Sequence, residues 1–98
     1  MRRKVRLSPD AVRHFRALRA YDQGLLRQAL EVQLQDDDAE QETRNRLRLR
    51  RPSELADFEL RVGPLRVFYR VVGDEVGVAL IGRKERDHLI IEGRRFVL

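Results

Sequence analysis

The clearest pattern of hydrophobic and polar positions lies in residues 58–72. Apolar and polar residues alternate there on both sides of Gly63-Pro64, which predicts two β-strands joined by a tight turn. If two residues form the turn, the register of the pair is set, and every second side chain lies on the same face. We expect one of these faces to form the core, and it comprises Phe58, Leu60, Val62, Leu65, Val67 and Tyr69.

The opposite face of this hairpin is rich in arginine. The register places Arg61 opposite Arg66, and Arg70 lies further along the same strand. Like charges that lie directly opposite each other destabilise a sheet. The pairing therefore favours a face that binds an anionic partner. An ordinary solvated face of an antiparallel sheet is the alternative that the pattern leaves open.

A second tight turn is predicted at Gly73-Asp74, followed by a strand over residues 75–83. With uninterrupted pairing, Arg66 lies opposite Ile81, and Arg83 joins the arginine face. Residues 85–98 fit either a short helix followed by a strand or a small terminal hairpin, and their pattern does not decide between the two.

Two helices are predicted ahead of this meander, after a short strand in residues 2–7. Ser8-Pro9-Asp10 combines an N-cap hydroxyl, a first-turn proline and an acidic residue, which predicts a helix from Pro9 to about Arg19. Asp22 is a candidate cap for a second helix that extends to about Gln35. The connection between them is short enough for an antiparallel pair.

The segment between the helices and the meander changes its charge from acidic in residues 36–42 to basic in residues 43–51. We expect it to be a connecting loop, largely solvated. Arg46 and Arg48 in the basic run are candidates to reach the arginine face. His14, in the middle of the first helix, is expected to be exposed to solvent.

This order of elements predicts an α+β fold. Two N-terminal antiparallel helices would pack on one face of a small, mostly antiparallel sheet, in the order strand, helix, helix, three-stranded meander and C-terminal extension. The length of 98 residues predicts a single domain over residues 1–98.

The composition restricts the chemistry. The net charge is +5, and only two of the 21 basic residues, Lys4 and Lys84, are lysines. Arginine binds phosphate through two parallel hydrogen bonds, so the bias favours a nucleic acid or an acidic partner. The absence of cysteine excludes disulfides and thiolate metal sites. We expect a cytoplasmic protein without cofactor, metal or membrane association, because no motif or apolar run indicates any of these.

Three segments of the chain resemble the RelE/ParE superfamily of toxins from bacterial type II toxin–antitoxin modules. They are SPDA at residues 8–11, ELRVGPLRVFYRV at residues 59–71 and IGRKER at residues 81–86. The resemblance covers nearly the whole chain in element order, and the hairpin is its most specific part. It implies helices packed on a small antiparallel sheet, which agrees with the pattern of the residues.

For the RelE branch, the resemblance implies a ribosome-dependent endoribonuclease that cuts mRNA by attack of a ribose 2′-hydroxyl on the neighbouring phosphate. This chemistry needs a base, cations around the phosphate and an acid for the leaving oxygen. Lys84, His88 and Glu59 are the candidates for proton transfer. The implied catalytic residues are Arg66, Arg83, Lys84 and His88. The expected RNA contacts are Arg61, Arg70, Arg86, Arg46 and Arg48.

The chain departs from the RelE branch at its C-terminal end. That branch commonly has a tyrosine there, which stacks on the substrate base, whereas this chain has Leu89-Ile90-Ile91 at the corresponding place. Phe68 or Phe96 could take the role. Two alternatives remain: a ParE-like poison of DNA gyrase, which needs no catalytic set, and a non-catalytic basic module that binds RNA or an acidic partner. If the chain is a toxin, the resemblance implies an acidic antitoxin that forms a hetero-oligomer with it.

Overall fold

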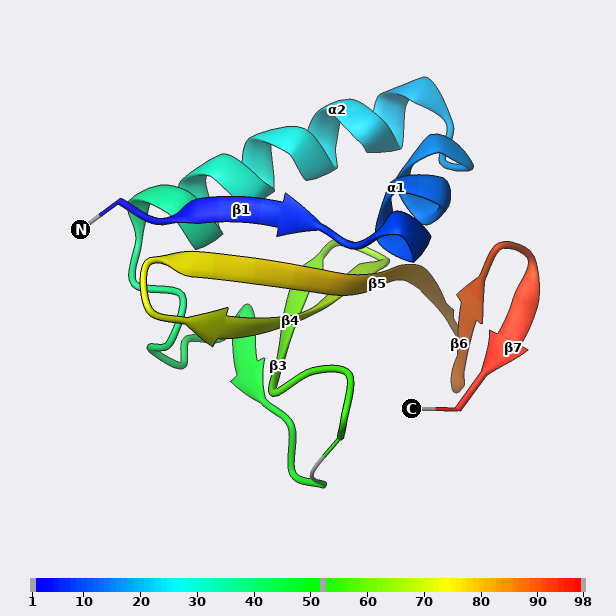
Figure 1. The fold of residues 1–98 in the computed structure, drawn as a ribbon. Coiled ribbons are helices and arrows are strands. Elements are labelled where there is room, and N and C mark those ends of the chain that lie inside the picture. The colour runs from blue at the N-terminus through cyan, green and yellow to red at the C-terminus, as the bar shows by residue number, and fades with distance from the viewer. Residues whose placement is uncertain (1, 52, 98) are drawn as a thin grey trace.

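The chain forms two layers, with helices on one face of a mostly antiparallel sheet (Figure 1). The computed structural model describes residues 2–51 and 53–97. The α+β class predicted from the sequence is confirmed at this level. The elements are β1 (Lys4–Leu7), α1 (Pro9–Arg16), α2 (Ala20–Ala29), a π-helical continuation η1 (Leu30–Asp36), β2 (Arg46–Arg48), β3 (Phe58–Val62), β4 (Leu65–Val72), β5 (Glu75–Glu85), β6 (His88–Ile91) and β7 (Arg94–Phe96).

The first helix begins as predicted, and the second does not. The Ser8 hydroxyl accepts a hydrogen bond from the Ala11 N–H at 3.0 Å, and α1 then runs only to Arg16. Arg19, rather than Asp22, is the N-cap of α2. Asp22 lies within the helix and is buried, and its carboxylate binds the side chains of Arg19 and Arg83. No helix in the described residues is long and apolar enough to cross a membrane.

The β3–β4 hairpin has the predicted register. Arg61 pairs with Arg66 across the strands, and Phe58 pairs with Tyr69. The predicted apolar face packs beneath the helices and forms the main core with α2 and η1. The Tyr69 hydroxyl donates a hydrogen bond to the Ala39 carbonyl at 2.7 Å, which ties the sheet to the segment that follows η1.

A β-bulge in β5 changes the pairing with β4. Tyr69 pairs with Val78, but Phe68 pairs with Leu80, so Ala79 is an extra residue on β5. One extra residue reverses the alternation of side chains along the rest of the strand. The expected pairing of Arg66 with Ile81 is therefore wrong, and Arg66 lies opposite Gly82.

The bulge decides which basic residue of β5 lies on which face. Ile81 is buried in the main core, and Arg83, two residues further, points to the same helix-covered side. The expectation that Arg83 lies on the arginine face is therefore wrong. Lys84 takes its place on the face away from the helices.

The basic run after the acidic segment includes a strand, which contradicts the predicted loop. In β2, Arg46 pairs with Leu60 and Arg48 with Phe58, so both arginines lie on the helix-covered side. The Arg46 side chain is buried, and its guanidinium binds the Gln33 carbonyl at 2.8 Å. The Arg48 guanidinium lies over the Phe58 ring, 4.5 Å from its centroid. Neither reaches the arginine face, so the expectation that they do is wrong.

The C-terminal segment is a hairpin, the second of the two forms that the sequence left open. Strand β6 pairs with the end of β5, and β7 pairs with β6. The hairpin contributes to a second apolar cluster on the face away from the helices, and Figure 1 shows it at the end of the chain beyond β5. This cluster contains Ala56, Phe68, Leu80 and Ile91, with Leu49, Ala79, Leu89 and Phe96 packed against it.

Candidate active site

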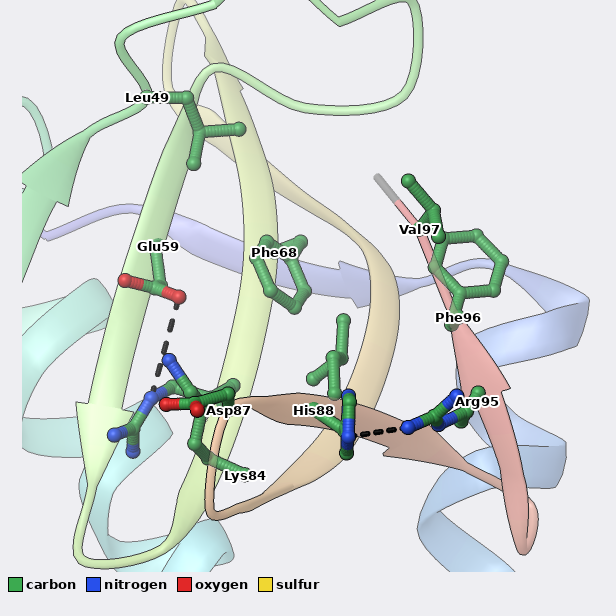
Figure 2. A pocket seen from close by; sticks show the side chains of 11 residues that line it. Leu49, Glu59, Phe68, Lys84, Asp87, His88, Arg95, Phe96 and Val97 are labelled. Carbon is green, nitrogen blue, oxygen red and sulfur yellow. Dashed lines mark hydrogen bonds and ion pairs between the residues drawn. The ribbon is translucent and has the colours of Figure 1, made fainter.

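A cavity of about 440 Å³ lies on the face of the sheet away from the helices. One part of its wall is charged and the other is apolar, as Figure 2 shows. Three of the four predicted catalytic residues line it, as does Glu59. The lining consists of Leu49, Glu59, Arg66, Phe68, Lys84, Asp87, His88, Leu89, Arg95, Phe96 and Val97.

Arg66 is held in the cavity wall by the protein itself. Its Nη1 atom donates hydrogen bonds to the Gly63 carbonyl at 2.7 Å and to the Leu65 carbonyl at 2.9 Å. The side chain is only 14% exposed. Burial lowers the pKa of Arg66, and the nearby Glu59 carboxylate opposes this shift. The guanidinium remains a cation at neutral pH, since arginine side chains are not deprotonated in proteins.

Glu59 explains how the sheet tolerates two opposed arginines. Its Oε1 atom accepts a hydrogen bond from Arg61 Nε at 3.0 Å, and its Oε2 atom lies 4.0 Å from Arg66 Nε. Part of the like-charge repulsion is therefore neutralised inside the protein. The pairing of Arg61 with Arg66 alone does not require an anionic ligand.

Lys84 enters the cavity wall because of the bulge. Its backbone N–H donates to the Pro64 carbonyl at 2.7 Å, which fixes β5 against the β3–β4 turn. The side chain is exposed and carries an ammonium group beside Arg66 in the same wall. This position supplies a second cation to any anion that enters the cavity.

His88, the first residue of β6, is exposed and contacts a neighbour that the sequence analysis missed. Its Nε2 atom lies within hydrogen-bond distance of Arg95 Nη2 (Figure 2). A guanidinium only donates, so Nε2 must accept, and a neutral His88 then carries its proton on Nδ1. Arg95 could have been found only by predicting the terminal hairpin, because it approaches His88 across β6 and β7.

Arg83 lies outside the cavity and forms an ion pair with Asp22 of α2. Its Nη2 atom is 2.5 Å from Asp22 Oδ2, and the same oxygen accepts a hydrogen bond from Arg19 Nε at 3.0 Å. The Asp22 side chain is 5% exposed. Arg83 therefore neutralises a buried carboxylate of α2, and the catalytic position predicted for it is corrected.

The remaining expected RNA contacts are dispersed. Arg61 lies beside the cavity on β3, whereas Arg70 lies further along the same face and binds Asp57 and the Ser53 carbonyl at 3.2 and 3.0 Å. Arg86 lies in the exposed β5–β6 turn, at a positive φ of 54°. Their role in RNA binding stays a prediction.

His14 contradicts the expectation of an exposed side chain. It is buried, and its Nδ1 atom accepts a hydrogen bond from the Ile81 N–H at 3.2 Å. The imidazole occupies a gap along the edge of β5 that faces away from β4, because β1 pairs with this edge only up to Val78 and β6 pairs with it only from Arg83.

The cavity thus combines groups for phosphate chemistry. Arg66, Lys84 and Arg95 supply positive charge, and Glu59 and His88 are able to exchange protons. The apolar part of the wall, with Phe68 and Phe96, offers a surface for a flat ring. The chain matches none of the known protein families with which it was compared, and no curated protein is similar to it.

Proposed function

We propose that this chain is the toxin of a type II toxin–antitoxin module and acts as a metal-independent endoribonuclease of the RelE kind, cutting mRNA on the ribosome. The observation that carries the proposal is the single cavity that holds Glu59, Arg66, Lys84 and His88. The resemblance of the hairpin to the RelE/ParE superfamily supports the same reading. The cavity favours a nuclease over a gyrase poison, because a protein that acts by binding alone needs no such combination.

The cleavage reaction uses the two sides of the cavity. Glu59 lies on one side, on β3, and His88 lies on the other, on β6 (Figure 2). The attacking and leaving oxygens of a phosphoryl transfer lie roughly in line, so its base and its acid must act from opposite sides. Glu59 removes the proton of the 2′-hydroxyl, whose oxygen forms the new bond to phosphorus.

The bond from phosphorus to the 5′-oxygen then breaks, and His88 protonates that oxygen. The products are a 2′,3′-cyclic phosphate and a free 5′-hydroxyl, and no water is consumed in this step. Arg66 and Lys84 stabilise the negative charge that gathers on the phosphate.

Arg95 links substrate binding to proton transfer. In the free protein its guanidinium donates a hydrogen bond to Nε2 of His88. A phosphate in the cavity competes for that guanidinium, because an anion binds it more strongly than a neutral imidazole does. When Arg95 turns to the phosphate, Nε2 of the exposed His88 is free to take up a proton from solvent, and this is the proton that it donates to the 5′-oxygen.

An acidic antitoxin is the proposed partner, and the two chains would form a hetero-oligomer. The net charge of +5 favours an acidic segment. Tyr21, Leu25 and Val32 are 68%, 38% and 46% exposed on the helical layer, and they offer an apolar surface for such a segment to fold on.

The test is cleavage of a defined mRNA in a translating extract, with the ends of the products identified. Wild-type protein should leave 2′,3′-cyclic phosphates, and Arg66→Ala, Glu59→Gln and His88→Gln should each reduce the rate by about a hundredfold or more. Arg6→Ala is a matched control, because Arg6 lies outside the cavity and binds Glu75 at 2.8 Å. Intact mRNA together with inhibited DNA supercoiling by gyrase would instead establish the ParE-like function.

A further inference from the structure

The wall of the cavity formed by the β6–β7 hairpin has few attachments to the rest of the sheet. Strand β6 pairs with β5 only through Arg83–Ile90, Lys84–Leu89 and Glu85–His88, and β7 pairs with β6. Yet this hairpin carries His88, Arg95 and Phe96, so its position determines the geometry of half the cavity.

The turn of the hairpin is attached to the first helix. Glu92 and Gly93 form the turn, with φ of 52° and 78°, and Ile91 pairs with Arg94 on either side of it. The Glu92 carboxylate accepts hydrogen bonds from Arg13 Nε at 3.1 and 3.0 Å. These contacts join residues that are 79 positions apart in the chain.

His14 adds a second attachment at the same turn. Its Nδ1 atom accepts the Ile81 N–H, so a neutral His14 has its proton on Nε2, which lies 3.4 Å from Glu92 Oε1. The imidazole therefore connects the backbone of β5 at Ile81 to the side chain of Glu92 in the turn. The other charged groups around this site are Asp10 on α1, and Arg83 and Glu85 on β5.

Gly82 allows the hairpin to lie close to β5 at Ile90 and Ile91, next to the turn. A Cβ atom at this position would be 2.7 Å from the Ile90 carbonyl oxygen and 2.8 Å from Ile91 Cγ1. The hairpin is thus seated on the backbone of β5 at Gly82 and attached to α1 at Glu92. These two contacts hold the turn end of the hairpin in place.

We propose that Glu92 is a positioning residue, which holds His88 and Arg95 at the cavity by fastening the β6–β7 hairpin to Arg13 and His14. The positioning role rests on the proposed function, since it matters to catalysis only if His88 and Arg95 take part. The attachment itself is a property of the fold and can be measured without any substrate.

The variant that isolates the attachment is Glu92→Asn. Both turn residues have positive φ, and Asn-Gly is the preferred pair for such a hairpin turn, so the turn itself is retained. The shorter side chain ends before Arg13 and His14. Asp10→Asn is the matched control, because Asp10 also binds Arg13, at 2.9 Å, but lies on α1 and not on the hairpin.

Amide hydrogen exchange and cleavage kinetics are measured on the same proteins. Glu92→Asn should speed exchange in residues 88–96 by about tenfold and leave β3 and β4 unchanged. It should also reduce kcat by about tenfold and raise KM by a smaller factor, because Arg95 loses its position while Arg66 and Lys84, which lie outside the hairpin, still bind the phosphate. Asp10→Asn should match wild type in both measurements. Arg13→Gln, on the opposite side of the contact, should reproduce the effects of Glu92→Asn.

Equal exchange in Glu92→Asn and Asp10→Asn would overturn the attachment. Faster exchange with an unchanged kcat would overturn the positioning role. If wild-type protein does not cleave RNA at all, the proposed function fails, while faster exchange in residues 88–96 of the variant still supports the attachment.

Discussion

Arg83 and Lys84 are adjacent at the end of β5, but the bulge at Ala79 places their side chains on opposite faces of the sheet. Replacing Arg83 should therefore mainly reduce stability, and replacing Lys84 should mainly reduce cleavage. Arg83→Ala removes a partner from Asp22, whose side chain is 5% exposed. Breaking a fully buried ion pair from one side costs about 3–5 kcal/mol. The cost should be smaller here, because Arg83 is 31% exposed and Arg19 still binds the same oxygen.

We therefore expect Arg83→Ala to lower the free energy of unfolding by about 2 kcal/mol, which corresponds to a fall in Tm of roughly 10 °C for a chain of this length. Lys84→Ala replaces an exposed side chain and should change the free energy of unfolding by less than about 0.5 kcal/mol. In the cleavage assay the order reverses: Lys84→Ala should be strongly impaired, and Arg83→Ala, measured well below its Tm, should stay near wild type.

Urea denaturation followed by circular dichroism gives the stabilities, and the double variant Asp22→Asn with Arg83→Ala tests the assigned contact. If the two residues interact, the effects of the single changes should not add. A Lys84→Ala protein that is less stable than Arg83→Ala, or an Arg83→Ala protein that is stable and inactive, would show that β5 has no bulge at Ala79 and that the arrangement of the cavity is wrong.

Three further predictions concern residues outside the cavity. Burial lowers the pKa of His14 below its ordinary value of 6.5, so the unfolded chain binds the proton more readily. Stability should therefore fall as the pH drops below about 6.5, and urea denaturation at pH 7 and pH 5 should show a smaller fall for His14→Asn than for wild type. Gly82→Ala should cost about 1–3 kcal/mol in the same assay, because the new methyl group meets the Ile90 carbonyl oxygen. Arg46→Ala should destabilise the fold and leave the salt dependence of RNA binding unchanged, whereas Arg61→Ala should reduce that dependence without unfolding the protein.

The parts of the fold that could be predicted are those in which apolar and polar residues alternate between clear turn signals. The β3–β4 hairpin met both conditions, and its register was right. In β5 the run from Val76 to Ile81 contains no polar residue, so nothing in the pattern showed where the alternation reverses. Leu89-Ile90-Ile91 in β6 also contains no polar residue, so the pattern did not show that this segment is a strand. Without the β6–β7 hairpin, nothing in the sequence placed Arg95 beside His88.

The charged residues were harder to place than the apolar ones, because the sequence does not show which acid each arginine meets. Arg46 looked like part of a solvated loop, yet its guanidinium is buried against the end of the helical layer and binds Asp37 at 3.3 Å. Asp22 looked like a helix cap, yet it binds Arg83 from another element. The first pair spans 9 positions and the second spans 61. Neither follows a helix or strand period, so both result from tertiary packing and not from a local pattern.

One structural feature connects the core with the candidate site. Without the extra residue at Ala79, β5 would direct Ile81 away from the main core and Arg83 towards the cavity, and Asp22 would lose one of the two arginines that neutralise it. The bulge therefore contributes both to the core and to the candidate site. It buries Ile81, brings Arg83 to Asp22 and places Lys84 beside Arg66. A change that removes the bulge should for this reason impair stability and the proposed cleavage together, whereas loosening the β6–β7 hairpin should impair cleavage with little loss of the main core.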